Sequence, residues 1–187
     1  MKRTQALHDA GQSIWLDNIT RALLDRGILD RYIARCSVTG LTSNPTILDN
    51  AIKEGTDYDA DIAARKATGA SDEEVVFELA LSDLRRAADK FAPIYARTDG
   101  VDGWVSLEVS PLLAHNAQST IEEATALYRQ GARGNLFIKI PGTAEGLPAI
   151  EECIYSRIPV NVTLLFSAEH YEAAAEAYLR GVERRIQ

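Results

Sequence analysis

Short apolar runs alternate with longer helical patterns along nearly the whole of this 187-residue chain. Such alternation is typical of βα units, in which parallel strands form a sheet that helices cover. The expected strands are residues 14–19, 38–41, 104–109, 136–140 and 160–166. We therefore predict an α/β fold, with an all-helical excursion over residues 46–95 between the second and third strands.

Hydroxyl residues mark the starts of three expected helices. The capping-box spacing of Ser71 and Glu74 predicts a helix that ends before Pro93. A second helix is expected over residues 119–131, and Ser167 is expected to cap the last one. In that last helix an apolar stripe at helical spacing predicts core contacts: Tyr171, Ala174, Ala175, Tyr178, Leu179, Val182 and Ile186.

Charge and composition exclude several classes of partner. The net charge of -7 leaves no basic stripe for a phosphate backbone, so no nucleic-acid partner is expected. No apolar run reaches the roughly 18 residues of a membrane span, and the first residues lack the apolar stretch of a secretory signal. We therefore expect a cytoplasmic protein without a membrane partner, with Cys36 and Cys153 as thiols.

Polar side chains interrupt nearly every expected strand near its carboxyl end, although a sheet covered on both faces should be apolar. The period of two places Leu136, Ile138 and Ile140 on one face, and Phe137 and Lys139 on the other. The polar residues at the strand ends are Asp17, Thr42, Asn44, Ser106, Glu108, Asn161 and Thr163. If these mixed faces point inward, the polar groups converge where α/β proteins place their chemistry.

Lys139 is the most unusual of these residues, because lysine is almost never fully buried without a partner. A buried amine can attack a carbonyl and form a Schiff base. An ordinary lysine has a pKa of about 10.4, which burial lowers and a carboxylate in contact raises. We therefore expect Asp17 or Glu108, or both, to be offset from this amine. The alternative is a structural ion pair of Lys139 with Glu108 or Asp17.

Two other kinds of site find no support in the sequence. His8, His115 and His170 are scattered without the spacing of metal ligands, so no metal site is expected. Neither Cys36 nor Cys153 has an obvious histidine partner, which argues against a thiol nucleophile.

Five stretches carry a family resemblance, and they occur in order along the whole chain. They are WLDN (15–18), GLTSNPT (40–46), VSLEV (105–109), NLFIKIPGT (135–143) and VNVTLLFS (160–167). In these stretches the sequence resembles the N-terminal portion of a transaldolase of the longer bacterial type. The resemblance implies a (β/α)8 barrel of the TIM type, of which this chain supplies about five βα units. Residues 1–187 would then form a single, C-terminally incomplete domain.

The resemblance also implies Schiff-base chemistry without a cofactor. A dihydroxyacetone unit would pass from a ketose phosphate, sedoheptulose 7-phosphate, to an aldose phosphate, glyceraldehyde 3-phosphate, in the pentose phosphate pathway. By motif, Lys139 would be the nucleophile and Asp17 the acid and base at the C4 hydroxyl. Glu108 would act through a water during carbinolamine formation and dehydration, and Thr163 would help to hold that water.

The remaining polar residues are implied to bind the substrate. Asn44 and Asn161 would hydrogen-bond its hydroxyl groups or the bound intermediate. Thr42 and Ser106 are lesser candidates for the same task.

The sequence departs from the family after the fifth expected strand. Phosphate sites on such barrels typically use late loops, which this chain does not supply. We therefore expect a homo-oligomer or a missing C-terminal half as partner. A simple aldolase is the near variant of the proposed transferase, and a catalytically silent fragment or assembly subunit that lacks its phosphate-binding half is the alternative.

Overall fold

The computed structural model describes residues 3–187, apart from the side chains of residues 45 and 46. The chain divides into two compact units, Met1–Val105 and Ser106–Gln187. Strand β3, Trp104–Glu108, begins in the first unit and ends in the second. The single domain expected over residues 1–187 stays a prediction.

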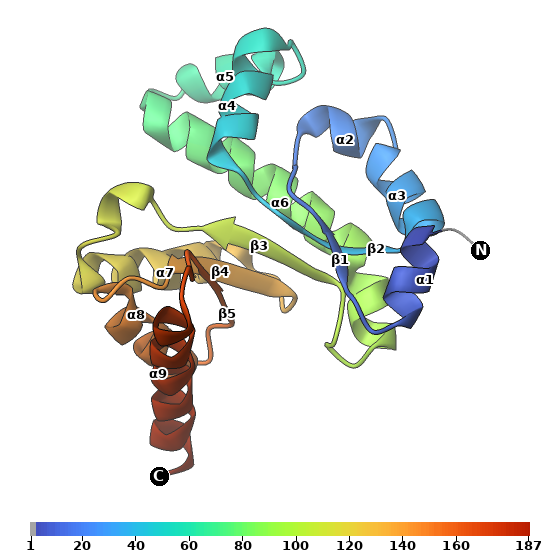
Figure 1. The fold of residues 1–187 in the computed structure, drawn as a ribbon. Helices are drawn as coiled ribbons and strands as arrows, with labels where there is room; N and C mark the ends of the chain where they lie inside the picture. Colours follow the sequence, from blue (N-terminus) through green and yellow to red (C-terminus); the bar gives the residue numbers. More distant parts are fainter. Residues whose placement is uncertain (1–2) are drawn as a thin grey trace. The chain divides into compact units, whose positions relative to one another are not determined.

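Two parallel strands organise the first unit (Figure 1), where β1, Ile14–Leu16, pairs with β2, Val38–Thr42. The backbone N–H of Gly103 donates to the carbonyl oxygen of Thr39 at 2.8 Å, which brings the start of β3 beside β2. The described helices of this unit are α1 (Arg3–Asp9), α2 (Arg21–Asp25), α3 (Ile28–Cys36), α4 (Pro45–Glu54), α5 (Asp59–Lys66) and α6 (Asp72–Arg97).

Helix α6 begins as predicted and ends later than predicted. The Ser71 hydroxyl accepts a hydrogen bond from the Glu74 backbone, and the Glu74 carboxylate accepts one from the Ser71 backbone, which confirms the capping box. The helix nevertheless continues past Pro93. Phe91 and Ile94 are buried on either side of the exposed proline. Their packing outweighs the hydrogen bond that proline cannot donate.

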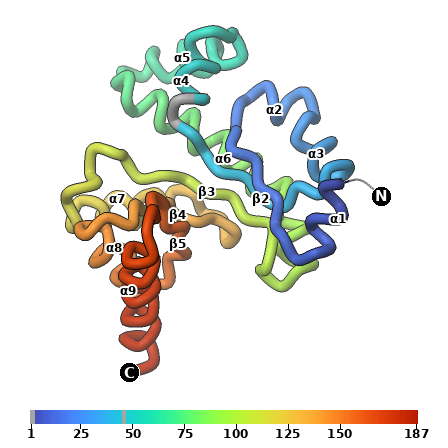
Figure 2. Tube along the Cα trace, in the orientation of Figure 1, coloured from blue at the N-terminus to red at the C-terminus, as the bar shows by residue number. Residues whose placement is uncertain are grey.

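The helical excursion has an apolar cluster of its own. Leu48 of α4, Tyr58 just before α5, and Val75 and Leu79 of α6 are all buried in it. The Cα trace shows α4 and α5 beside the N-terminal half of α6 (Figure 2). This cluster makes the excursion a packed substructure and not a loose connection.

The second unit repeats the parallel arrangement. Strand β4, Leu136–Pro141, pairs with β5, Val160–Thr163. The backbone N–H of Val109 donates to the carbonyl oxygen of Lys139 at 3.2 Å, so the end of β3 lies beside β4. The helical elements of this unit are η1 (Pro111–Leu113), α7 (Ala117–Gly131), α8 (Gly146–Tyr155) and α9 (Ala168–Ile186).

The strands neighbour one another in chain order, as β1-β2-β3 in the first unit and β3-β4-β5 in the second. A helical element follows each strand along the chain. Parallel strands in this order are the arrangement of (β/α) barrels, and they confirm the α/β class. Among the described residues, no helix is both long and apolar enough to cross a membrane.

Two element boundaries in the second unit differ from the prediction. Strand β5 ends at Thr163 because Leu164 adopts a left-handed backbone conformation with φ 61°, which no strand continues. Helix α7 begins before Ser119, because the side chain of Asn116 caps it by accepting from the Ser119 backbone at 3.0 Å. Ser167 caps α9 as predicted.

The core contacts predicted for the apolar stripe of α9 are largely wrong. Its large members, Tyr171, Tyr178, Leu179 and Ile186, are exposed. The helix instead packs on α8 through small residues, Ala174, Ala177 and Gly181. A Cβ at Gly181 would lie 2.6 Å from the carbonyl oxygen of Glu151, so the approach of the two helices favours small side chains over the aromatic stripe.

We expect Gly40→Ala to lower the free energy of unfolding by about 1–3 kcal/mol, the range for overpacking. A Cβ at Gly40 would lie 2.5 Å from the Trp15 ring, which covers this position of β2. Chemical denaturation measures the change. The matched control is Gly134→Ala, where no heavy atom lies within 4 Å. Equal stability of the two variants would contradict the close packing of Trp15.

We expect iodoacetamide at about pH 9 to alkylate Cys36 and to spare Cys153. Burial, together with the charge of Glu152, raises the pKa of Cys153 to about 12, whereas Cys36 is only half-buried.

An unfolded thiol ionises near pH 8.5, so above that pH the unfolded chain releases a proton that the folded chain keeps, and stability falls. Mass spectrometry locates the label, and addition of denaturant should expose both thiols.

Candidate active site

Lys139 lies on the mixed face of β4, held between buried neighbours. Ile138 and Ile140 on the opposite face are fully buried, while Phe137 and Lys139 are partly accessible. Only 14% of the Lys139 side chain is exposed. The side chain as a whole is therefore largely withdrawn from bulk water, which is the setting expected for a nucleophilic lysine.

The amine of Lys139 has one carboxylate partner in direct contact. Its Nζ donates to Oε2 of Glu108 at 3.1 Å, from β4 to the end of β3. This is the pair that the structural alternative expects, and it also places a proton acceptor at the predicted nucleophile. Asp17 belongs to the first unit, so the expectation that one of the two carboxylates is offset from the amine stays a prediction.

Asn161 stands beside Lys139 and reaches across it. The register of β4 and β5 pairs Lys139 with Asn161. The Asn161 Nδ2 donates to the Ser106 hydroxyl oxygen of β3 at 3.1 Å, although β4 lies between these two strands. Strands are about 4.8 Å apart, so two strands on either side of a third are separated by about 10 Å. These short side chains can meet only if the sheet curves toward their face.

The second unit therefore has a concave polar face, made of Ser106, Glu108, Lys139 and Asn161. Ser106 is fully buried, which makes it the floor of this face. The four groups offer one amine, one carboxylate and two neutral hydrogen-bonding groups. This set can bind a polyhydroxylated carbonyl compound and move protons on it.

Thr163 ends β5 next to this face. It pairs with Pro141 in the register of the two strands. Its hydroxyl oxygen is buried and finds no hydrogen-bond partner among the residues that the structure describes. An unpartnered buried hydroxyl costs about 1–3 kcal/mol, so it is a natural place for a water or a substrate oxygen.

The first unit brings together two of the residues expected at the site. Asp17 follows β1 and is exposed, and Asn44 follows β2. The Asn44 Nδ2 lies 3.4 Å from Oδ2 of Asp17. The hydroxyl of Thr42, the last residue of β2, donates to the backbone oxygen of Ser43 at 3.3 Å and not to this pair.

The sequence reasoning missed a buried polar cluster in the first unit, formed by Arg21, Tyr58 and Asp83. Asp83 carried a signal, because it falls between Leu81 and Leu84 on the buried side of α6. A carboxylate at an apolar helix position indicates a buried partner. The local sequence around Asp83 could not predict that its partner is Arg21, because the two residues are 62 positions apart.

Metal binding has no obvious donors in the part of the chain that the structure describes. No group of three or more histidine, cysteine, aspartate or glutamate side chains is arranged there to hold an ion.

Comparison with known proteins gives a consistent answer. The model of the Transaldolase/Fructose-6-phosphate aldolase family matches residues 14–185. The chain is similar to a transaldolase of Arthrobacter sp. (strain FB24), with 49% identity over 97% of this chain and 49% of that protein. It is also similar to a transaldolase of Thermobifida fusca (strain YX), with 49% identity over 98% and 50%.

A transaldolase of Trichodesmium erythraeum (strain IMS101) is 46% identical over 96% of this chain and 47% of the relative. The chain therefore spans about half the length of the curated relatives it matches.

We expect Ser106→Ala to destabilise the second unit by about 1–3 kcal/mol, because it leaves the Asn161 amide without its acceptor. Urea denaturation, followed by a probe in α7–α9, measures the change. The control is Ser156→Ala, which removes an exposed contact of 3.4 Å to Glu152 and should change stability by less than about 0.5 kcal/mol. A loss no larger than the control's would mean that the hydrogen bond across β4 does not hold the concave face.

Proposed function

This chain belongs to the transaldolase/fructose-6-phosphate aldolase family, and we propose that it performs the Schiff-base chemistry of a transaldolase. The observation that carries the proposal is the largely buried Lys139 side chain, whose amine lies 3.1 Å from Glu108 on a concave polar face. A lysine in this setting has both a proton acceptor and a wall that limits its hydration. Both are needed for attack on a ketone at neutral pH.

Imine formation uses the pair directly. Glu108 takes the proton that the ammonium must lose, and the Nζ lone pair bonds to the carbonyl carbon of a ketose phosphate. The nitrogen passes one of its two protons to the carbonyl oxygen, which becomes a hydroxyl. That hydroxyl leaves as water when Glu108 returns its own proton to it, directly or through a water at Thr163. The iminium that results is an electron sink, so this step requires no cofactor.

Cleavage then requires a second base. Asp17 takes the proton of the C4 hydroxyl as the C3–C4 bond breaks, and the electrons of that bond pass into the iminium. An aldose phosphate departs, and a three-carbon enamine stays on Lys139. Attack of the enamine on a second aldose phosphate, followed by hydrolysis, completes the transfer. Asp17 is exposed after β1, which leaves it accessible to substrate.

Neutral side chains in each unit bind the substrate hydroxyl groups in this proposal. Because Asn161 donates to Ser106, its amide orientation is fixed and its oxygen is left as an acceptor. Asn44 plays the corresponding part beside Asp17. Thr42 is a lesser candidate, since its hydroxyl contacts the backbone of Ser43.

The proposed donor is sedoheptulose 7-phosphate and the proposed acceptor is glyceraldehyde 3-phosphate, which places the reaction in the pentose phosphate pathway and the protein in the cytoplasm. The relatives named transaldolase support this substrate class. Because the chain spans about half their length, the proposed partner is a C-terminal half or a second copy that supplies the grip on phosphate.

A catalytically silent assembly subunit is the second candidate, and one observation favours it. Helix α9 and the segment before it expose large apolar side chains, with Phe166 and Ile186 about four-fifths accessible at 81% and 79%. Uncovered apolar surface of this kind is typical of a face that another chain or segment covers. This candidate predicts assembly without Lys139 chemistry.

The two candidates differ in a trapping experiment. We expect sodium borohydride with sedoheptulose 7-phosphate to label the chain covalently at Lys139, because hydride reduces the iminium to a stable secondary amine. Peptide mapping by mass spectrometry locates the adduct. Lys139→Met should abolish it, and Glu108→Gln should slow it at least about tenfold by removing the proton acceptor.

The matched control is Lys53→Met, which removes an exposed lysine paired with Asp49 and should leave the labelling intact. A folded chain without any adduct would support the silent subunit. Turnover that requires a second aldose phosphate separates the transferase from a simple aldolase.

A further inference from the structure

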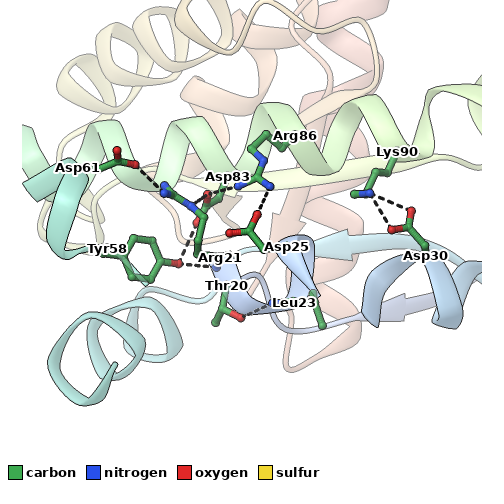
Figure 3. A network of polar contacts seen from close by, with 10 residues as sticks. All are labelled: Thr20, Arg21, Leu23, Asp25, Asp30, Tyr58, Asp61, Asp83, Arg86 and Lys90. Carbon is green, nitrogen blue, oxygen red and sulfur yellow. Dashed lines mark hydrogen bonds and ion pairs between the residues drawn. The ribbon is translucent and has the colours of Figure 1, made fainter. Parts of the chain in front are cut away.

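Arg21 ties the start of α2 to two other helices of the first unit (Figure 3). It is the first residue of α2, and only the four-residue loop 17–20 separates it from β1. Its side chain is buried and donates to Oδ1 of Asp83 on α6 and to Oδ2 of Asp61 on α5, each at 2.6 Å. The loop that begins with Asp17 therefore ends at a fixed point.

A single hydroxyl completes this attachment. The Tyr58 oxygen accepts from the backbone N–H of Arg21 at 2.7 Å and donates to Oδ2 of Asp83 at 2.8 Å. The Arg21 guanidinium also lies 4.9 Å from the centre of the Tyr58 ring. Burial raises the pKa of Tyr58, so its hydroxyl keeps the proton that it donates. We call Arg21, Tyr58 and Asp83 the Tyr58 node.

The same tyrosine anchors the second loop of interest. Its ring belongs to the buried cluster that includes Leu48 of α4. Helix α4 begins directly after Asn44. Asp17 and Asn44, whose side chains lie 3.4 Å apart, therefore each precede a helix that is fixed to Tyr58.

Two other ion pairs, which join α6 to α2 and to α3, are more exposed. Asp25 pairs with Arg86, and Asp30 pairs with Lys90 at 2.8 Å (Figure 3). Exposed pairs contribute little to stability, whereas a buried pair that loses one partner leaves a costly uncompensated group. The buried Tyr58 node is therefore better suited than these exposed pairs to hold loop 17–20 in one geometry.

We propose that Arg21, Tyr58 and Asp83 are positioning residues that hold the Asp17 loop against Asn44 and so orient the Asp17 carboxylate. They touch no substrate and act only through the loop. The catalytic consequence rests on the proposed function, whereas the positioning itself does not.

Tyr58→Phe tests the positioning in the 187-residue chain. The variant keeps the ring in its cluster and removes the hydroxyl that the Arg21 N–H requires. We expect hydrogen–deuterium exchange, followed by mass spectrometry, to be at least about tenfold faster in residues 17–21, which the hydroxyl holds, and unchanged in 136–141. Lys90→Ala, which removes an exposed pair of the same helix, is the control and should change neither segment.

Exchange at the wild-type rate in residues 17–21, or equal acceleration by Lys90→Ala, would overturn the proposal. Circular dichroism checks that the helices persist. If Tyr58→Phe loses the helices, Asp83→Asn takes its place as the test variant. This substitution removes the negative charge of Asp83 and keeps an oxygen acceptor.

Borohydride trapping provides a second measurement. Its result should not change if the Tyr58 node has only a structural role. The trapped adduct is either the intact sugar or the three-carbon unit left after cleavage. We expect Tyr58→Phe to leave the total label on Lys139 unchanged and to lower the share of the three-carbon adduct at least about fivefold. If residues 17–21 exchange faster but the share of the three-carbon adduct is unchanged, the proposal that the Tyr58 node orients Asp17 is wrong. Absence of any label in the wild-type chain would instead overturn the proposed function.

Discussion

The contact between Lys139 and Glu108 is the interaction on which the candidate site depends. A lysine in a buried strand must be paired, and the 3.1 Å contact pairs it without extending the amine into bulk water. The backbone hydrogen bond from Val109 to Lys139 fixes the two strands next to each other. The same contact fits a structural ion pair and a proton transfer equally well. Only an experiment that tests for a covalent adduct on Lys139 distinguishes these two roles.

Curvature of the second unit turns separate strand ends into one face. Ser106 and Asn161 come from strands on either side of β4, and they bond above it. A flat sheet would hold them too far apart for these short side chains. Because Ser106 is fully buried, the hydrogen bond also satisfies a polar group that would otherwise destabilise the interior.

Polar burial in the first unit has a different character. The Tyr58 node contains no group at the carboxyl ends of the strands, yet it lies at the base of both loops that carry Asp17 and Asn44. The desolvation of Arg21 and Asp83 costs free energy, and the hydrogen bonds within the node offset part of that cost. On α9 and the segment before it, by contrast, large apolar side chains such as Ile186 and Phe166 stay exposed.

The amino-acid pattern alone predicted the alternation of strands and helices, the caps at Ser71 and Ser167, and the face of β4 that carries Lys139. These features depend on periods of two and 3.6 residues and on contacts within one turn, which a local sequence contains. Only the tertiary structure decided that Asn161 reaches Ser106, that Tyr58 joins Arg21 to Asp83, and that the stripe on α9 is exposed. Each of these features depends on which distant element packs against a given face. The sequence period predicts that a helix or strand has such a face, but it does not predict which element covers it.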